Sequence, residues 1–238
     1  MLQSQSQSPS SSLPTLYTYF RSSCSARVRI ACHLKGIELS YIHTNLLQGE
    51  QHSSEYRTTN PCATVPTLVI PADLPHNNTS IPIVIRQSVA ILEFLEEYPA
   101  YAHTPKLLPD DPVARAEVRE LVNIICEDVQ PASNQYILKM VDALNGDKGN
   151  WAKQVISRGF GAYEELLKSY SGKFSFGDKV SMADVCMAPA VDAALRWGVD
   201  MDAFPLTRRV YETVRVLEPF LKGDWRHQDD TLEEFRTL

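Results

Sequence analysis

The spacing of apolar residues changes near residue 100, and this change most limits the folds open to the chain. Between residues 14 and 100, short β-prone runs alternate with segments whose apolar residues recur every three or four positions. After residue 111 only the helical spacing remains. A polar, proline-bearing stretch that begins at Pro99 separates the two patterns. We therefore predict an α/β domain over 13–100, a linker over 101–111 and an all-helical domain over 112–238.

The first pattern predicts a small mixed sheet covered by helices. Its elements would be a strand at 15–19, a helix at 23–35, a strand at 39–44, a hairpin of 68–70 with 81–85, and a helix that begins at Gln87-Ser88. Gly36 fits the left-handed position that commonly ends a helix. This alternation of strands and helices favours an α/β domain.

The second pattern predicts a group of packed helices. They would cover 112–129 with a break at Pro131, 137–144, 151–170 capped by Asn150, 181–197 capped by Ser181, and 206–217. The segment 181–197 is almost wholly apolar, so we expect it at the centre of the domain. Residues 227–238 are rich in charge, and we expect them to form a surface tail.

The charge and the N-terminal composition exclude several classes of protein. The chain has 238 residues with 23 basic and 29 acidic side chains, a formal charge of −6, which disfavours general affinity for nucleic acids or anionic membranes. No apolar run approaches the roughly 18 residues of a membrane span. Residues 1–12 are rich in Ser and Gln and lack a basic start or an apolar stretch, so we expect a disordered tail and no secretory signal.

The cysteine and histidine patterns argue for a reducing compartment and against a metal site. The five cysteines are an odd number and form no CxxC pair, which disfavours both a disulfide framework and a zinc site. The six histidines show no ligand spacing. We therefore expect a cytoplasmic protein that holds no metal.

Hydroxyls and a thiol lie where the first predicted strand meets the first predicted helix. Here Arg21-Ser22-Ser23-Cys24 directly precedes the helical spacing. A helix N-terminus has unpaired N–H groups and a partial positive charge, so this is a place to bind or generate an anion. Ser22 or Ser23 could equally be a plain N-cap, and Cys24 could be an inert buried thiol or a reactive one.

Two further positions have backbone properties that suit an extended or anionic ligand. Pro66 stands directly before a predicted strand, and the Val65-Pro66 bond is of the kind in which a cis peptide is accessible. Gln87-Ser88 opens a helix, which offers a second anion-binding N-terminus, although Ser88 is compatible with a simple capping role. Weaker candidates, which are a surface glutamine, two polar residues at a helix break and an arginine near a helix end, are Gln51, Gln130, Asn134 and Arg196.

Several short sequence motifs, taken in their order along the chain, resemble those of a zeta-class glutathione transferase. The resemblance rests on Arg21-Ser22-Ser23-Cys24-Ser25, Asn60-Pro61, Val65-Pro66-Thr67-Leu68, Gln87-Ser88, Pro109-Asp110-Asp111-Pro112 and Ser181-Met182-Ala183-Asp184. It covers about 14–220, nearly the whole chain, and the Ser-Ser-Cys start is the block that points to the zeta class. The resemblance implies a thioredoxin-like N-terminal domain, an all-helical C-terminal domain and a homodimer.

The resemblance also implies roles for individual residues. Ser23 would donate its hydroxyl to the thiolate of the cofactor glutathione, with Ser22 and Cys24 beside it. Lowering a thiol pKa from about 8.5 to about 6.5 takes about 2.7 kcal/mol, which a hydroxyl and a helix N-terminus can supply. The implied cofactor-binding positions are Gln51, Val65, Pro66, Gln87, Ser88, Gln130 and Asn134. The second substrate of the class is a small dianion, so Arg196 and Arg21 are the candidate substrate-binding cations, whereas Arg27 and Arg29 are expected in structural ion pairs.

The characterised activity of the class is maleylacetoacetate isomerase, which converts maleylacetoacetate to fumarylacetoacetate in tyrosine and phenylalanine catabolism. The glutathione thiolate adds to the conjugated double bond, the bond rotates, and the thiolate leaves unchanged. One alternative is a transferase for other electrophiles, such as α-halo acids, because Ala26 stands where the class usually has tryptophan. Another is a non-catalytic glutathione-binding scaffold, which the presence of Ser23, Gln87 and Ser88 disfavours. A redox role for Cys24 is weaker still, since it lacks a CxxC partner.

Overall fold

A four-stranded mixed sheet forms the first half of the molecule. The computed structural model describes residues 13–77 and 79–236, so the tail expected over 1–12 lies outside the described residues. The strands are β1 (Thr15–Thr18), β2 (Ser40–His43), β3 (Thr67–Ile70) and β4 (Ile83–Arg86). Their order is β2-β1-β3-β4, with β1 parallel to β2 and β3 antiparallel to both of its neighbours.

Three helices accompany this sheet, and the alternating pattern predicts the first and the third of them. They are α1 (Ser23–Lys35), α2 (Ser54–Thr59) and α3 (Ser88–Glu97). Parallel strands need a crossover connection, and α1 supplies it between β1 and β2. Gly36 ends α1 with φ of 66°, and its N–H bonds to the carbonyls of Cys32 and His33, as expected for a left-handed C-terminal position.

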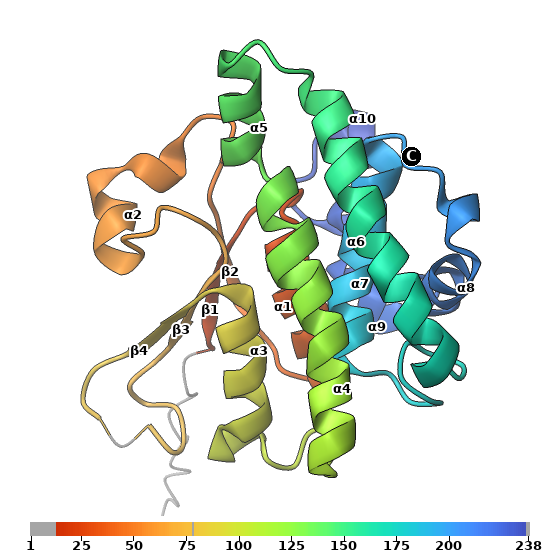
Figure 1. Ribbon diagram of the computed structural model, residues 1–238. Coiled ribbons are helices and arrows are strands. Elements are labelled where there is room, and N and C mark those ends of the chain that lie inside the picture. Colours follow the sequence, from red (N-terminus) through yellow and green to blue (C-terminus); the bar gives the residue numbers. More distant parts are fainter. Residues whose placement is uncertain (1–12, 78, 237–238) are drawn as a thin grey trace, which may run out of the picture.

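The second half is helical throughout. Its α-helices are α4 (Pro112–Asn123), α5 (Gln135–Ala143), α6 (Lys148–Tyr170), α7 (Met182–Arg196), α8 (Pro205–Val214), α9 (Glu218–Gly223) and α10 (Glu233–Arg236). A π-helical turn, Ile124–Val129, continues α4. Figure 1 shows the sheet on one side and these helices on the other, with α1 between them. No helix among the described residues is both long and apolar enough to cross a membrane.

Helix α7 lies at the centre of the helical half, as its apolar sequence predicts. Nearly all of its residues are buried, and it contacts α1, α4, α6 and α8. The predicted cap at Ser181 is confirmed as a capping box, because Asp184 accepts bonds from the Ser181 N–H at 2.8 Å and from the Ser175 N–H at 2.8 Å. The buried carboxylate thereby fixes the start of the helix that carries Arg196.

Two predicted helix boundaries are wrong for local reasons. Helix α6 begins at Lys148 because Asp147, rather than Asn150, is its cap and accepts from the N–H groups of both Gly149 and Asn150. The helix predicted over 206–217 ends at Val214, and a separate short helix, α9, follows it.

The residues after α8 are packed against the first half, which contradicts the expected surface tail over 227–238. We refer to residues 218–236 as the C-terminal segment. Within it Gln228 and Thr231 are buried, and the Phe20 N–H donates to Asp230 at 2.9 Å across 210 positions of sequence. A Cβ atom on Gly223 would lie 2.9 Å from the backbone nitrogen of Ile30, so this glycine allows α9 to approach α1 closely. The segment therefore reaches the turn that contains Ser22 and Ser23.

Candidate active site

The N-terminus of α1 presents a free hydroxyl. Ser22 is the N-cap, and its Oγ accepts from the Ser25 N–H at 3.1 Å, which settles the choice between the two serines. Ser23 is the first residue of the helix and is partly exposed. Within the described part of the chain its hydroxyl has no hydrogen-bond partner, so it can donate to a ligand at the positive end of the helix.

A cleft opens directly at this helix end. It encloses about 440 Å³ of space open to solvent and lies between α1, α7, α8 and the C-terminal segment. Of the residues singled out by the sequence, it brings together Arg21, Ser22, Ser23 and Arg196. Cys24 is not among its lining residues and instead lies 3.7 Å from Arg27 Nη1. The candidate substrate cations and the candidate hydroxyl donor therefore share one cleft.

The Val65-Pro66 peptide is cis, as the expected role for this edge requires. The preceding loop is held by Asn60, whose side-chain amide donates to the Thr64 carbonyl at 2.8 Å and to Thr67 Oγ1 at 2.9 Å. Neither the N–H nor the C=O of Val65 forms a backbone hydrogen bond within residues 13–77 and 79–236. An extended peptide could pair with this free edge in the manner of an added strand.

The start of α3 combines an unusual backbone with a buried hydroxyl. Gln87 is the N-cap, has φ of 71°, and makes no side-chain capping bond, so its amide is not used by the helix. Ser88 is therefore not the cap. Its buried Oγ accepts from Arg27 Nη1 at 3.1 Å.

Arg27 is a buried cation in the first turns of α1 that contacts the start of α3. Its side chain is 1% exposed, yet Nε and Nη2 have no partner. No carboxylate of the described residues lies within ion-pair distance of it. A buried charge without a partner is unfavourable, so this arginine is suited to compensation by an anion.

Arg29 is just as deeply buried as Arg27 but has a full set of partners. Its Nε donates to the Gly223 carbonyl at 3.1 Å, its Nη1 to Thr18 Oγ1 at 2.9 Å, and its Nη2 to the Phe20 carbonyl at 3.1 Å. Burial lowers its pKa to about 10. The expected ion pairs are wrong for both arginines. Carbonyl and hydroxyl oxygens take the place of carboxylates around Arg29, whereas Arg27 donates only through Nη1, to Ser88 Oγ and Cys24 Sγ.

None of the seven predicted cofactor-binding positions lines the cleft, and three of them lie in turns or at helix ends outside α1 and α3. Gln51 lies in a short 3₁₀ turn, where its Oε1 is buried without a partner and its Nε2 is 3.1 Å from His52 Nε2. Gln130 follows the π-helical turn. Asn134 caps α5, and its Oδ1 accepts from the Ile137 N–H at 3.0 Å, so its side chain has a structural task. None of the three lines the cleft described above.

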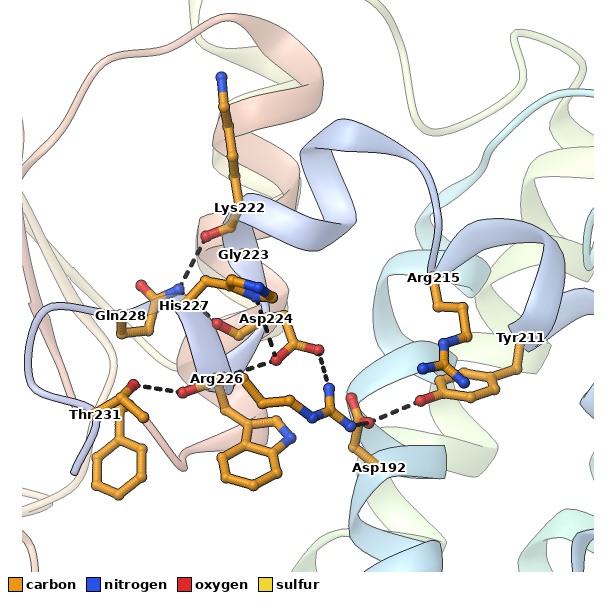
Figure 2. A network of polar contacts seen from close by, with 12 residues as sticks. Asp192, Tyr211, Arg215, Lys222, Gly223, Asp224, Arg226, His227, Gln228 and Thr231 are labelled. Carbon is orange, nitrogen blue, oxygen red and sulfur yellow. Dashed lines mark hydrogen bonds and ion pairs between the residues drawn. The ribbon is translucent and has the colours of Figure 1, made fainter. Parts of the chain in front are cut away.

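The C-terminal segment contributes cleft residues that the sequence interpretation missed. The Arg196 guanidinium lies over the ring of Trp225, 5.5 Å from its centroid. Arg226 pairs with Asp192 at 3.2 Å and with Asp224, while the Tyr211 hydroxyl donates to Asp192 at 2.8 Å (Figure 2). Burial raises the pKa of Asp192. Apart from Asp224 and Arg226, these partners are far apart in sequence, so no local pattern could have linked them.

Two cysteines near Arg27 were also missed. Cys126 lies in the π-helical turn and Cys186 in α7. The neighbouring Cys186 thiol lowers the pKa of Cys126, and Arg27 acts in the same direction while burial opposes it. Neither cysteine belongs to a recognisable motif, so only the packing of the two helices reveals the pair.

Two family models match the chain, the N-terminal domain of glutathione S-transferases over residues 21–98 and the C-terminal domain over residues 151–218. The chain belongs to the glutathione S-transferase family. The maleylacetoacetate isomerase of Aspergillus fumigatus is 48% identical to this transferase over 93% of this chain and 94% of its own length. The maleylacetoacetate isomerase of Mus musculus is 43% identical over 94% of this chain and 98% of its own length.

Solved structures agree with this assignment. A maleylacetoacetate isomerase from Anaeromyxobacter dehalogenans, with glutathione bound in its active site, matches with a TM-score of 0.82 and 35% identity over 92% of this chain and 98% of that one. A bacterial maleyl pyruvate isomerase of the zeta class gives a TM-score of 0.82 and 34% identity over 92% and 100%. The expected thioredoxin-like domain followed by an all-helical domain is therefore confirmed for this transferase.

Proposed function

We propose that this glutathione S-transferase is a maleylacetoacetate isomerase that uses glutathione as its cofactor. The observation that carries the proposal is the shared cleft, in which the free hydroxyl of Ser23 faces the same space as Arg21 and Arg196. This pairing of a hydroxyl donor with cations suits a reaction of a thiolate with a small dicarboxylate. Relatives that bear this name at 43–48% identity support the same conclusion.

The residues present fit glutathione. Val65 offers an unpaired backbone edge beside Pro66. Ser88 lies at a helix N-terminus and accepts from Nη1 of Arg27, whose other two donors, Nε and Nη2, have no partner. We propose that Val65 pairs with the peptide backbone of glutathione and that Gln87 and Ser88 bind its γ-glutamyl carboxylate. Gln51, which has an unpartnered buried oxygen, is proposed at the glycyl end, with Gln130 and Asn134 approaching from the helical domain.

When bound, glutathione supplies the thiolate that adds to the conjugated double bond and later leaves. We propose that Ser23 Oγ donates a hydrogen bond to this sulfur, while the N-terminus of α1 adds its partial positive charge. Ser22 fixes the turn by capping the helix. Cys24, which contacts Arg27, is assigned a supporting position beside Ser23.

We propose that Arg196 and Arg21 bind the carboxylates of the second substrate. Neither arginine forms an ion pair with another described residue. Desolvation lowers the pKa of Arg196, and the charges of Arg21 and Arg226 act in the same direction while Asp192 opposes them. Cations that repel each other across a cleft are suited to an anion that bridges them.

A transferase for other electrophiles is the second candidate, and one observation favours it. Ala26 lines the cleft, where its small side chain leaves room for acceptors other than a diketo acid. We further propose that the protein is a homodimer. We also propose that it works in a reducing compartment such as the cytoplasm, which is supported by its five cysteines, all of them free thiols.

The deciding experiment follows maleylacetone spectroscopically with and without glutathione, in parallel with conjugation of an α-halo acid. We expect isomerisation that requires glutathione and does not consume it. Bound glutathione without isomerisation would refute the proposal, and turnover of the halo acid would then identify a transferase instead of a binding protein.

A further inference from the structure

We propose that the C-terminal segment sets the specificity for dianions by holding both substrate-binding arginines on aromatic rings, Arg196 on Trp225 and Arg21 on Phe235. This inference rests on the proposed function and deepens it. It adds two positioning residues, Trp225 and Phe235, to a cleft whose cations come from other parts of the chain.

Each arginine is matched with one ring of the segment. The Arg196 guanidinium carbon lies 5.5 Å from the Trp225 ring centroid, and that of Arg21 lies 5.0 Å from the Phe235 centroid. A guanidinium that lies over a ring is attracted to it while its N–H edge stays available to carboxylates. Arg215, which lines the same cleft, also lies over a ring, 5.4 Å from the Tyr211 centroid, but it differs because it pairs with Glu212 and its ring belongs to α8.

The ring beneath Arg196 is itself fixed in place. Trp225 is buried, and Arg226 lies over the same indole, 4.9 Å from its centroid. Arg226 is held in turn by Asp192 of α7 and by Asp224 (Figure 2). The Trp225 carbonyl also accepts from Thr231 Oγ1. The indole is therefore a rigid support and not a mobile surface group.

The ring beneath Arg21 is fixed by the turn that precedes Ser22 and Ser23. Phe235 stacks on Phe20 with centroids 6.1 Å apart and an interplanar angle of 28°, and it packs edge-on against Trp225 at 5.9 Å. Both supports thus belong to one aromatic cluster. Because this cluster is continuous, the separation of the two guanidiniums is set by the segment.

The consequence is a preference for ligands with two carboxylates. Arg21 and Arg196 have like charges, and the carboxylates nearby are engaged by Arg226. Mutual repulsion would drive two free guanidiniums into solvent, whereas the rings keep both at the cleft. A dicarboxylate can relieve the repulsion at both positions, and a monocarboxylate only at one.

The test measures binding of succinate and acetate by calorimetry in saturating S-methylglutathione, so it does not require turnover. Trp225→Leu should weaken succinate binding about threefold to fivefold, Phe235→Leu should do the same, and the double variant should lose about tenfold or more. Acetate binding should change less in each variant. Trp225→Phe, which keeps a ring, should remain within about twofold of wild type.

Controls separate positioning from general damage. Phe174→Leu removes a ring beneath Lys173, 5.3 Å away and outside the cleft, and should leave succinate binding unchanged. The dissociation constant for S-methylglutathione should also stay constant in the Trp225 and Phe235 variants. Unchanged succinate binding in both Leu variants, or an equal loss for succinate and acetate, would overturn the inference. If wild type binds succinate through these rings but does not isomerise maleylacetone, the proposed function fails and the inference stands.

Discussion

The two halves of the candidate site are built in different ways. The glutathione half comes from the α/β domain, where each feature has a local cause: the cap at Ser22, the cis Val65-Pro66 peptide and the positive φ of Gln87. The substrate half joins Arg21, Arg196 and the C-terminal segment across long stretches of sequence. In the proposed site, cofactor binding and substrate choice thus have separate structural supports, so we expect that they can be altered separately.

The largest expected effect comes from the residue that joins the two halves. Arg29→Met should lower the free energy of unfolding by about 3–5 kcal/mol, because the Gly223 and Phe20 carbonyls and the Thr18 hydroxyl would lose a buried donor. Urea denaturation followed by circular dichroism measures this change. A loss below about 1 kcal/mol would show that the contact of α9 with α1 does not depend on this arginine.

A loss of catalysis that is equal for all electrophiles should follow a change in the glutathione half. Ser23→Ala should reduce kcat/KM at least about tenfold, equivalent to about 1.4 kcal/mol, for both a dianionic and a neutral acceptor. The pH dependence of kcat/KM should shift to higher pH, because the pKa of the glutathione thiol rises when no hydroxyl stabilises the thiolate. Ser22→Ala is the matched variant. Unchanged kinetics in Ser23→Ala would remove Ser23 from its assigned role.

An effect that depends on the acceptor should follow a change in the substrate half. Arg196→Ala should raise KM for the dianionic acceptor maleylacetoacetate about fivefold, or about 1 kcal/mol, and change KM for a neutral electrophile less. Steady-state kinetics with both acceptors give the ratio. Equal changes would contradict the separation of the two halves.

The smallest effect sharpens the contrast between the two buried arginines of α1. Arg27→Met should alter the free energy of unfolding by no more than about 1 kcal/mol, since it removes a charge that has no ionic partner. It should nevertheless weaken glutathione binding about threefold, because Ser88 loses the donor behind it. Calorimetry measures the affinity of Arg27→Met for glutathione. Urea denaturation of Arg27→Met and Arg29→Met compares the stability of the two variants. Arg27→Met with a stability loss like that of Arg29→Met would make both arginines structural.

The sequence predicted those features whose physical cause is local. The N-cap at the start of α1, the left-handed Gly36 and the capping box at Ser181 each depend on a few adjacent residues, whereas the residues around Pro66 made a cis bond accessible without predicting it. The order of strands and helices followed from periodicity for the same reason.

What the sequence could not predict depends on partners that are distant in the chain. Arg27 and Arg29 are chemically alike and two positions apart, yet only tertiary packing gives Arg29 three acceptors and leaves Arg27 with free donors. The end of the chain, residues 227–238, is rich in charge, so its composition suggested a surface tail. Its burial arises from Arg226 meeting Asp192 and from Phe20 meeting Asp230, contacts that no local pattern encodes.

The close approach of Gly223 to Ile30 also bears on how the molecule is made. During translation the α/β domain emerges first and can form its sheet while later helices are still being synthesised. The cleft, by contrast, lacks a wall until α9 and Trp225 have left the ribosome and docked on α1. With the roles proposed above, a nascent chain would form most of its glutathione-binding residues before the wall that selects the second substrate.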